Sequence, residues 1–387
     1  MTQGTPVNPD VLRWARETAG LSVEDVAGKL GRKTIDAETV SAWEAGNGSP
    51  SYPQLETLAH VIYRRPLAVF FFPVVPHEET PQTEFRTLPD AVIDALPPGI
   101  VKLYRKAKLF QLYLEDLYEG RKPIELSLLD RFELDERSHL TSVAEAIRQA
   151  LGITVEEQRE WRSADTAFKR WREALEASGT FVFKDAFRND DYSGFCLYST
   201  NYPLIYVNNS MPASRQVFTL FHELGHLLYH SGGVDFRSRE AVRSFQGYYR
   251  DVEVGCNRFA NDVLVPQQVF DSLDPTVSET RFQELADYFS VSREVILRNY
   301  LDRRLVSPAY YEQMAAKWAD EARGKRGTPG GDYYRNLRTY LGERYVDLVY
   351  TQYHRNKITL ENVAEYLNVK AKNLPTLERT ALEGGRP

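Results

Sequence analysis

Residues 215–230 have the sequence RQVFTLFHELGHLLYH, and the interpretation of the whole chain starts from this stretch. Its apolar residues recur at the three- and four-residue spacing of a helix, which predicts one buried helix. His222 and His226 are four residues apart, a step of about 400° along a helix, so both imidazoles lie on one face, one turn apart. Glu223 lies next to that face. One helix therefore presents two imidazoles and a carboxylate together.

The pattern His-Glu-x-x-His is typical of a metal-dependent hydrolase. Two imidazoles one helical turn apart both reach a single Zn²⁺ at about 2.0–2.1 Å. Glu223 is too displaced to bind the same ion but is well placed to act as general base toward a metal-bound water, whose pKa zinc lowers to about 7. The alternative is a histidine pair that only packs in a core. That alternative requires other partners for two buried histidines and two buried glutamates.

A third metal ligand is expected on a second helix, in the stretch DVEVGCNRFANDVLVP (251–266). Apolar residues at helical spacing indicate that this helix is packed. Glu253 is the third ligand in this interpretation, which predicts one Zn²⁺ per chain. Asn257, one turn later, is expected to orient an imidazole by accepting its free N–H. Cys256 is interpreted as a small buried residue rather than as a thiolate switch on the zinc.

Other residues near the motif have open roles. His230, one turn beyond His226, is interpreted as a surface or neighbouring residue rather than as part of the cleft. The segment PLIYVNN (203–209) is either an edge strand that binds an extended peptide or a strand that only closes the sheet. A hydrolytic site also needs a donor for the oxyanion. The candidate donors, among which the sequence does not choose, are Tyr229, Tyr248, Tyr249 and Arg250.

Residues 9–65 are expected to form four or five short helices joined by short turns, the pattern of a helix-turn-helix bundle. Ser22 and Asp25 form a capping-box pair at the start of the second helix, and Gly31 ends that helix. Asp36 is the expected N-cap of the third helix. The predicted core of this bundle consists of apolar residues at helical spacing, namely Leu12, Leu21, Val26, Leu30, Val40 and Trp43.

Changes in composition along the chain predict four domains. They are a helix-turn-helix domain (1–75), a linker and helical segment (76–178), a zinc metallopeptidase domain (179–323) and a helical C-terminal domain (332–387). The stretch GKRGTPGG (324–331) is the clearest linker. Short β-branched and aromatic runs between residues 180 and 210 indicate a small antiparallel sheet before the metal-binding helix. The expected fold class is α+β, mainly helical, with a zincin-like peptidase domain.

The composition is that of an ordinary soluble globular protein, with 42% hydrophobic and 26% charged residues among 387. A formal net charge of −6 gives no global reason to expect nucleic acid or an anionic membrane as partner. Two cysteines cannot build a disulfide framework, which fits a reducing cytosol. The chain shows no signal peptide, and no apolar run approaches the roughly 18 residues of a transmembrane helix. A cytoplasmic location and no membrane partner are expected.

Taken together, these segments resemble the ImmA/IrrE metallopeptidases fused to an N-terminal Xre-type helix-turn-helix domain. The resemblance covers most of the chain, including SAWEAGNGSPSYPQLETLAHVIYRRPLAVFFFP, TEFRTLP, FTLFHELGHLLYH and GGDYYRNLRTYLGERYV. It implies a gluzincin-like zinc metalloendopeptidase with His222, His226 and Glu253 as ligands and Glu223 as general base. It also implies regulatory proteolysis, often of a repressor or antitoxin, next to a DNA- or protein-binding module.

The helix-turn-helix departs from the usual DNA-binding pattern. Residues 1–73 carry seven basic and eight acidic residues, whereas a module that binds phosphates normally presents a basic face. The expected recognition helix, 36–45, has no Lys or Arg. Two interpretations stay open: DNA binding that is weak for a monomer and stronger for a homodimer or with a partner, or a fold retained for protein docking or dimerisation. The candidate DNA contacts are Arg32, Lys33, Thr34, Thr39 and Ser41.

Two functions from different classes remain. The first is a metallopeptidase that removes a repressor or partner protein, with a role in transcription regulation and stress response. The second is an antitoxin-like regulator of a toxin–antitoxin module that binds a toxin and DNA with little or no turnover. The complete motif favours the first, because a pure binder has no need of Glu223. The neighbouring gene distinguishes them, since the first predicts a repressor there and the second a nuclease-like toxin.

Overall fold

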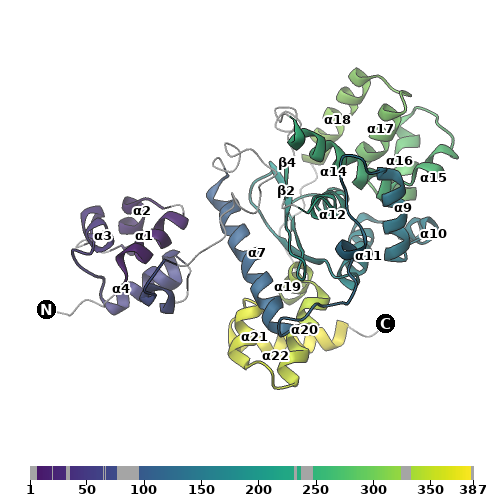
Figure 1. Cartoon of the computed structure of the whole chain (residues 1–387). Helices are drawn as coiled ribbons and strands as arrows, with labels where there is room; N and C mark the ends of the chain where they lie inside the picture. The colour runs from purple at the N-terminus through teal and green to yellow at the C-terminus, as the bar shows by residue number, and fades with distance from the viewer. Residues whose placement is uncertain are drawn as a thin grey trace. The chain divides into compact units, whose positions relative to one another are not determined.

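The chain is mainly helical with one small sheet, so the predicted α+β fold class is confirmed (Figure 1). It divides into two compact units, one made of residues 1–80 with 96–102 and the other of 81–95 with 103–387. The four predicted domain boundaries stay predictions, and the linker 324–331 lies outside the described residues. The computed structural model describes residues 7–19, 21–31, 35–63, 65, 67–75, 96–230, 233–236, 247–323 and 333–384.

The N-terminal unit is a bundle of short helices whose ends follow the predicted signals. The Ser22 side chain accepts from the Asp25 backbone N–H at 3.1 Å, and the Asp25 side chain accepts from the Ser22 N–H at 3.0 Å. Gly31 ends its helix at φ 64°, and Asp36 caps the next one. The capping box and both helix ends are confirmed. The elements are α1 (Pro9–Thr18), α2 (Val23–Leu30), α3 (Ala37–Glu44), α4 (Tyr52–Glu56), the π-helix η1 (Thr57–Tyr63) and the 3-10 helix η2 (Leu67–Phe71).

A buried ion pair lies beside the apolar core of this unit. Glu44, at the end of α3, is 5% exposed. The Arg16 guanidinium donates to both of its carboxylate oxygens, at 2.7 and 2.8 Å, and Arg13 donates to its carbonyl at 2.7 Å. One acid of the expected recognition helix therefore faces inward and is neutralised by a base from α1. Of the predicted core residues, Leu12, Val26, Val40 and Trp43 are buried, while Leu21 and Leu30 are partly buried and pack against them.

The second unit contains the sheet and the remaining helices. Before the sheet come α7 (Pro98–Leu117), α8 (Leu128–Arg131), α9 (Leu140–Leu151), α10 (Val155–Glu160) and α11 (Ala164–Ala177). After the third strand come α12 (Ala213–Leu228), α14 (Tyr248–Leu264), α15 (Gln267–Asp271), α16 (Glu279–Phe289), α17 (Arg293–Asp302) and α18 (Pro308–Arg323). The C-terminal helices are α19 (Tyr333–Leu341), α20 (Glu343–His354), α21 (Leu360–Tyr366), η3 (Ala371–Asn373) and α22 (Leu374–Gly384). None of the described helices is long and apolar enough to cross a membrane.

Four strands form one mixed sheet in the order β1-β3-β2-β4. They are β1 (Phe181–Asp185), β2 (Tyr192–Leu197), β3 (Leu204–Asn208) and β4 (Gly233–Phe236). β2 is antiparallel to β3 and β4, but β1 and β3 run parallel, in register from Phe181 with Leu204 to Asp185 with Asn208. The antiparallel prediction is therefore wrong for this pair. β1 and β2 follow each other in the sequence but are not neighbours in the sheet, because β3 lies between them. β3 runs antiparallel to β2 and parallel to β1.

The position of β3 also corrects the prediction for PLIYVNN. This segment lies between β1 and β2, so its backbone groups already pair on both sides and it is no edge. The alternative, a strand that closes the sheet, holds. Among the described strands, β1 and β4 are the edges.

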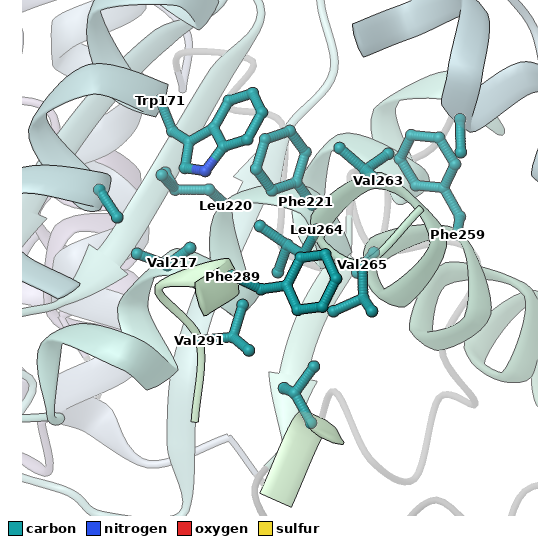
Figure 2. Close-up of a cluster of buried hydrophobic side chains, with 14 of the residues drawn as sticks. Trp171, Val217, Leu220, Phe221, Phe259, Val263, Leu264, Val265, Phe289 and Val291 are labelled. Carbon is teal, nitrogen blue, oxygen red and sulfur yellow. The ribbon is translucent and has the colours of Figure 1, made fainter. Parts of the chain in front are cut away.

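α12 lies in the hydrophobic core of the second unit, and every residue from Thr219 to Leu228 is buried. It packs on α14, α11 and strands β2 and β3. Figure 2 shows apolar side chains of α11, α12 and α14 meeting those that end and follow α16. The predicted buried helix is confirmed. The labelled side chains are Trp171, Val217, Leu220, Phe221, Phe259, Val263, Leu264, Val265, Phe289 and Val291.

The Arg16–Glu44 pair generates a test of the N-terminal unit. Glu44→Gln is expected to destabilise that unit by about 2–3 kcal/mol, because the partly buried Arg16 guanidinium loses its charged partner. The measurement is hydrogen exchange of the amides of residues 9–63 in the full chain. Glu38→Gln, at an exposed position of the same helix, is the matched control and should leave exchange almost unchanged. Equal protection in both variants would show that the ion pair contributes nothing.

Candidate metal centre

His222 and His226 of α12 meet Glu253 of α14 in the interior of the second unit. The Nε2 atoms of His222 and His226 are 3.2 Å apart. Glu253 Oε2 lies 3.5 Å from His222 Nε2, and Glu253 Oε1 lies 3.2 Å from His226 Nε2. The three side chains are almost fully buried. Within the described ranges, this is the group of His, Cys, Asp and Glu side chains whose ligand atoms converge on one point.

The three separations fit a single metal ion. Ligand atoms bound at about 2.0–2.1 Å with tetrahedral angles lie about 3.3–3.4 Å from one another. The observed separations of 3.2, 3.5 and 3.2 Å bracket this value. Two imidazoles and a carboxylate are also a donor set that zinc accepts at catalytic sites, where a fourth position stays open. The structure thus brings the predicted ligands together, and their role as ligands stays a prediction.

The Glu253 carboxyl is held in its charged form. Burial by itself raises the pKa of this group, but the neighbouring His226 and His222 outweigh burial and lower the pKa to about 2. A carboxylate is the form that binds a metal ion. Glu253 therefore needs no deprotonation at neutral pH before it acts as a ligand.

Gly194 of β2 sets the distance between the sheet and Glu223. A Cβ at residue 194 would lie 2.5 Å from Thr219 Cγ2 and 2.9 Å from the Tyr206 carbonyl oxygen. The same Cβ would lie 3.7 Å from Glu223 Oε1. Only glycine lets β2 approach α12 this closely, beside a carboxylate that is fully buried. Sequence reasoning missed Gly194, because a glycine within a strand signals a close approach without naming the partner.

α12 and α14 touch at Gly225 and Cys256. A Cβ at residue 225 would lie 3.1 Å from Cys256 Sγ and 3.2 Å from Cys256 Cα. Cys256 is completely buried at this crossing, which supports its interpretation as a small packing residue. Gly225 occupies a wildcard position of the motif, so the motif pattern alone did not reveal its role. The absence of a side chain there lets the short Glu253 side chain reach both histidines.

Buried polar side chains hold the C-terminal end of α14. Arg148 of α9 donates to the Val263 carbonyl at 2.8 Å and to Gln158 Oε1 at 2.6 Å. Gln158 in turn donates to the Leu264 carbonyl at 3.0 Å. These bonds satisfy carbonyls that a helix end leaves without partners inside the helix. The helix that carries Glu253 is therefore fixed at its far end as well as at its crossing with α12.

Two further candidate residues lie near Glu253, namely Asn257 on α14 itself and Tyr229, which contacts α14. Asn257 donates to the Glu253 carbonyl at 2.8 Å, and its predicted contact with an imidazole stays a prediction. The Tyr229 hydroxyl lies against Gly255, where an added Cβ would be 2.5 Å away. Burial raises the pKa of Tyr229 to about 12, so its hydroxyl keeps the proton that a hydrogen-bond donor needs.

The remaining candidates differ in exposure. Tyr248, 47% exposed, and Arg250 are both exposed, whereas Tyr249 is half-buried. Tyr249 and Arg250 precede Glu253 by about one turn on the same side of α14. His230 Nδ1 lies 3.7 Å from Glu133 Oε1, and its ring lies against Tyr198. His230 is outside the metal-binding group.

The candidate DNA contacts are only partly described. The Thr39 hydroxyl donates to Asp36 Oδ1 at 2.6 Å, so it takes part in the N-cap of α3. Ser41 is exposed. Their contact with DNA stays a prediction. The three others, Arg32, Lys33 and Thr34, lie outside the described residues.

Comparison with known families matches two parts of the chain. Residues 175–300 match a peptidase family described as an IrrE N-terminal-like domain, and this range includes the His-Glu-x-x-His motif and Glu253. Residues 10–68 match a helix-turn-helix domain. A search of curated proteins returned no match. The expected combination of an IrrE-type peptidase domain with an N-terminal helix-turn-helix is confirmed.

We expect one zinc ion per chain, measured by elemental analysis of the purified protein. His222→Ala and Glu253→Ala should each lower the zinc content sharply, because a site with two protein ligands binds the ion much more weakly. Glu223→Gln should keep its zinc. His230→Ala removes a histidine that lies just after α12 and serves as the matched control. Stoichiometric zinc in the double variant His222→Ala/His226→Ala would refute the ligand assignment.

Proposed function

We propose that this chain, in which an IrrE N-terminal-like domain is joined to a helix-turn-helix domain, is a zinc metalloendopeptidase that cleaves a regulatory protein. The observation that carries the proposal is the convergence of His222, His226 and Glu253 at separations of 3.2 to 3.5 Å. The match of residues 175–300 to a peptidase family supports it. Glu223 supports it further, because a protein that only binds its partner has no use for a buried carboxylate beside a metal ion.

In this proposal His222, His226 and Glu253 would hold zinc, and Glu223 would act as the general base and then as the proton donor. Zinc supplies Lewis acidity, which lowers the pKa of water and polarises a substrate carbonyl. Glu223 accepts a proton from the attacking water and passes it to the leaving amine. Its complete burial against Gly194 keeps the carboxylate away from bulk solvent.

A donor for the oxyanion completes the proposed reaction. Tyr229, Tyr249 and Arg250 are the described candidates nearest to Glu253 in the fold or along α14. Tyr229 is protonated at neutral pH like any tyrosine, and burial, which raises its pKa to about 12, extends this to alkaline pH. A protonated hydroxyl is what oxyanion stabilisation requires. We leave the choice among the three to mutagenesis.

Strand β4 is the proposed docking place for the substrate. It is an edge of the described sheet and contacts α12. An edge strand presents N–H and C=O groups to which an extended chain adds by backbone hydrogen bonds. Such pairing recognises the backbone and favours an unfolded segment of a protein as substrate. Selectivity for one regulatory protein then depends on contacts outside the sheet, and the helix-turn-helix unit is the proposed source of them.

Cleavage of the protein encoded beside this chain tests the enzymatic proposal. We expect the zinc-loaded protein to cut that neighbour within an extended segment, and a chelator to stop the cut. Glu223→Gln should lower the rate by about 10²–10⁴-fold, because the general base is lost. Glu133→Gln, an exposed glutamate near His230, is the matched control. A stable complex with zinc-loaded wild type and no cleavage would contradict the proposal and support an antitoxin-like binding function.

Binding to DNA is proposed to be weak for a monomer. Residues 1–73 carry seven bases and eight acids, and Arg16 is already paired with Glu44. With about two or three phosphate contacts, affinity should fall no more than about 10–100-fold between 50 and 200 mM salt. The measurement is a salt titration on the chain's own promoter, with scrambled DNA of equal length as control. Nanomolar binding by the monomer with a steeper salt dependence would contradict this estimate.

A further inference from the structure

A cavity of about 1200 Å³ lies in the second unit, and its lining does not include the metal-binding group. It is bounded by α11, β1, the first turn of α12 and the C-terminal helices α19, α20 and α22. Cavities of several hundred Å³ or more with converging polar groups are typical of small-molecule sites. The functions considered so far make no use of this cavity.

Lys184 of β1 lines this cavity with a side chain that is almost fully buried. Its side chain is 8% exposed, and its ammonium lies 4.3 Å from the ring centre of Phe168, another lining residue. Within the described part of the chain, the ammonium makes no hydrogen bond and no ion pair. The two other bases on that wall are already engaged, Arg172 with Glu176 at 2.9 Å and Lys169 with Glu343 at 3.4 Å. Lys184 therefore forms no ion pair among the described residues, although Asp165, another lining residue, acts electrostatically on its charge.

A hydrogen-bond acceptor that has no partner among the described residues lines the same cavity. Gln216, in the first turn of α12, donates its Nε2 to the Met211 carbonyl at 2.6 Å, which fixes the orientation of the amide. Its Oε1 is buried and accepts no hydrogen bond from the described residues. Buried polar atoms normally have partners. A bound molecule with a hydrogen-bond donor would satisfy this acceptor, and an anionic group on it would pair with Lys184.

The surroundings favour a negative ligand. Arg338 of α19, Arg344 of α20 and Arg379 of α22 line the wall formed by the C-terminal helices. The N-terminal end of α12 adds the partial positive charge of a helix start, and no side chain caps it. Acidic residues also line the cavity. Glu176 and Glu343 are held in ion pairs with Arg172 and Lys169, and Glu173 is held in ion pairs with Lys169 and Arg170. Asp165 on α11 and Asp347 on α20 are the other acids of the lining. The lining as a whole carries six basic and five acidic side chains, an excess of one positive charge.

We propose that this cavity binds a small organic anion whose phosphate or carboxylate oxygens pair with Lys184 and whose hydrogen-bond donor reaches Gln216. Such a ligand contacts α12 six residues before His222, about 9 Å along the helix, and the C-terminal helices at the same time. It is thereby positioned as an effector of the helix that carries two metal ligands. The binding step stands independently of the proposed peptidase activity.

Proton uptake gives the proposal a specific signature. Burial, and then the nearby Arg172, lower the pKa of Lys184 to about 7, although Asp165 acts in the opposite direction. An anion beside the ammonium raises that pKa. At pH 8 binding therefore draws a proton onto Lys184, whereas at pH 6 the ammonium is already charged and uptake is close to zero.

The experiment is calorimetric titration of the full chain with sulfate, a probe whose own charge does not change near neutral pH. Titrations at pH 6 and pH 8, each in two buffers of different ionisation enthalpy, measure both affinity and proton uptake. Chloride at equal ionic strength corrects for screening. We expect one saturable site and an uptake of about half a proton or more at pH 8.

Two variants test the assignment of that site. Lys184→Met should weaken sulfate binding by about 10- to 100-fold and abolish the uptake, since one charged hydrogen bond is lost. Arg379→Gln, at an exposed position of the lining, tests the site without disturbing the interior and should weaken binding several-fold. Lys317→Met, an exposed lysine paired with Glu279 outside the cavity, should bind like wild type. Absence of saturable binding, or unchanged binding in both cavity variants, would overturn the proposal.

Discussion

Where α12 crosses α14, Gly225 lies against Cys256, and the small Cys256 side chain and its Cα occupy the space where a Cβ of residue 225 would be. The metal-binding geometry depends on this contact, because Glu253 is less than one turn from Cys256 while His222 and His226 lie on either side of Gly225. A bulkier residue at the crossing would push the helices apart and draw the Glu253 carboxylate away from the imidazoles. The apolar side chains of Figure 2 and the polar contacts of Arg148 keep the two helices together.

The sequence predicts a site well when one helix carries it. His222, Glu223 and His226 were predictable because the geometry of a helix converts their spacing along the chain directly into spacing in three dimensions. Glu253 was predictable as a residue of a second packed helix. Its distance from the histidines was not, because that distance depends on how residues far apart in the sequence pack at the helix crossing.

Strand order, strand direction and the burial of charged residues were not predictable from the sequence. Alternating and apolar runs predict strands, but they carry no signal for strand order or direction, so the parallel pairing of β1 with β3 was missed. Counting charges treated Glu44 as part of an acidic surface, whereas it is buried against Arg16. Lys184 was missed for a related reason, since a single lysine in an apolar strand has meaning only once the cavity beside it is known.

Burying His222, Glu223, His226 and Glu253 together is unfavourable for folding unless something compensates. Two carboxylates removed from water lose their hydration, and their contacts with the imidazoles offset only part of that lost free energy. In the proposed function a metal ion would supply positive charge here, and its binding free energy would then contribute to the stability of the fold. The large apolar core around α12 must offset this unfavourable desolvation free energy before any ion binds. The His-Glu-x-x-His motif accordingly lies in a helix that is buried from Thr219 to Leu228 rather than on a surface loop.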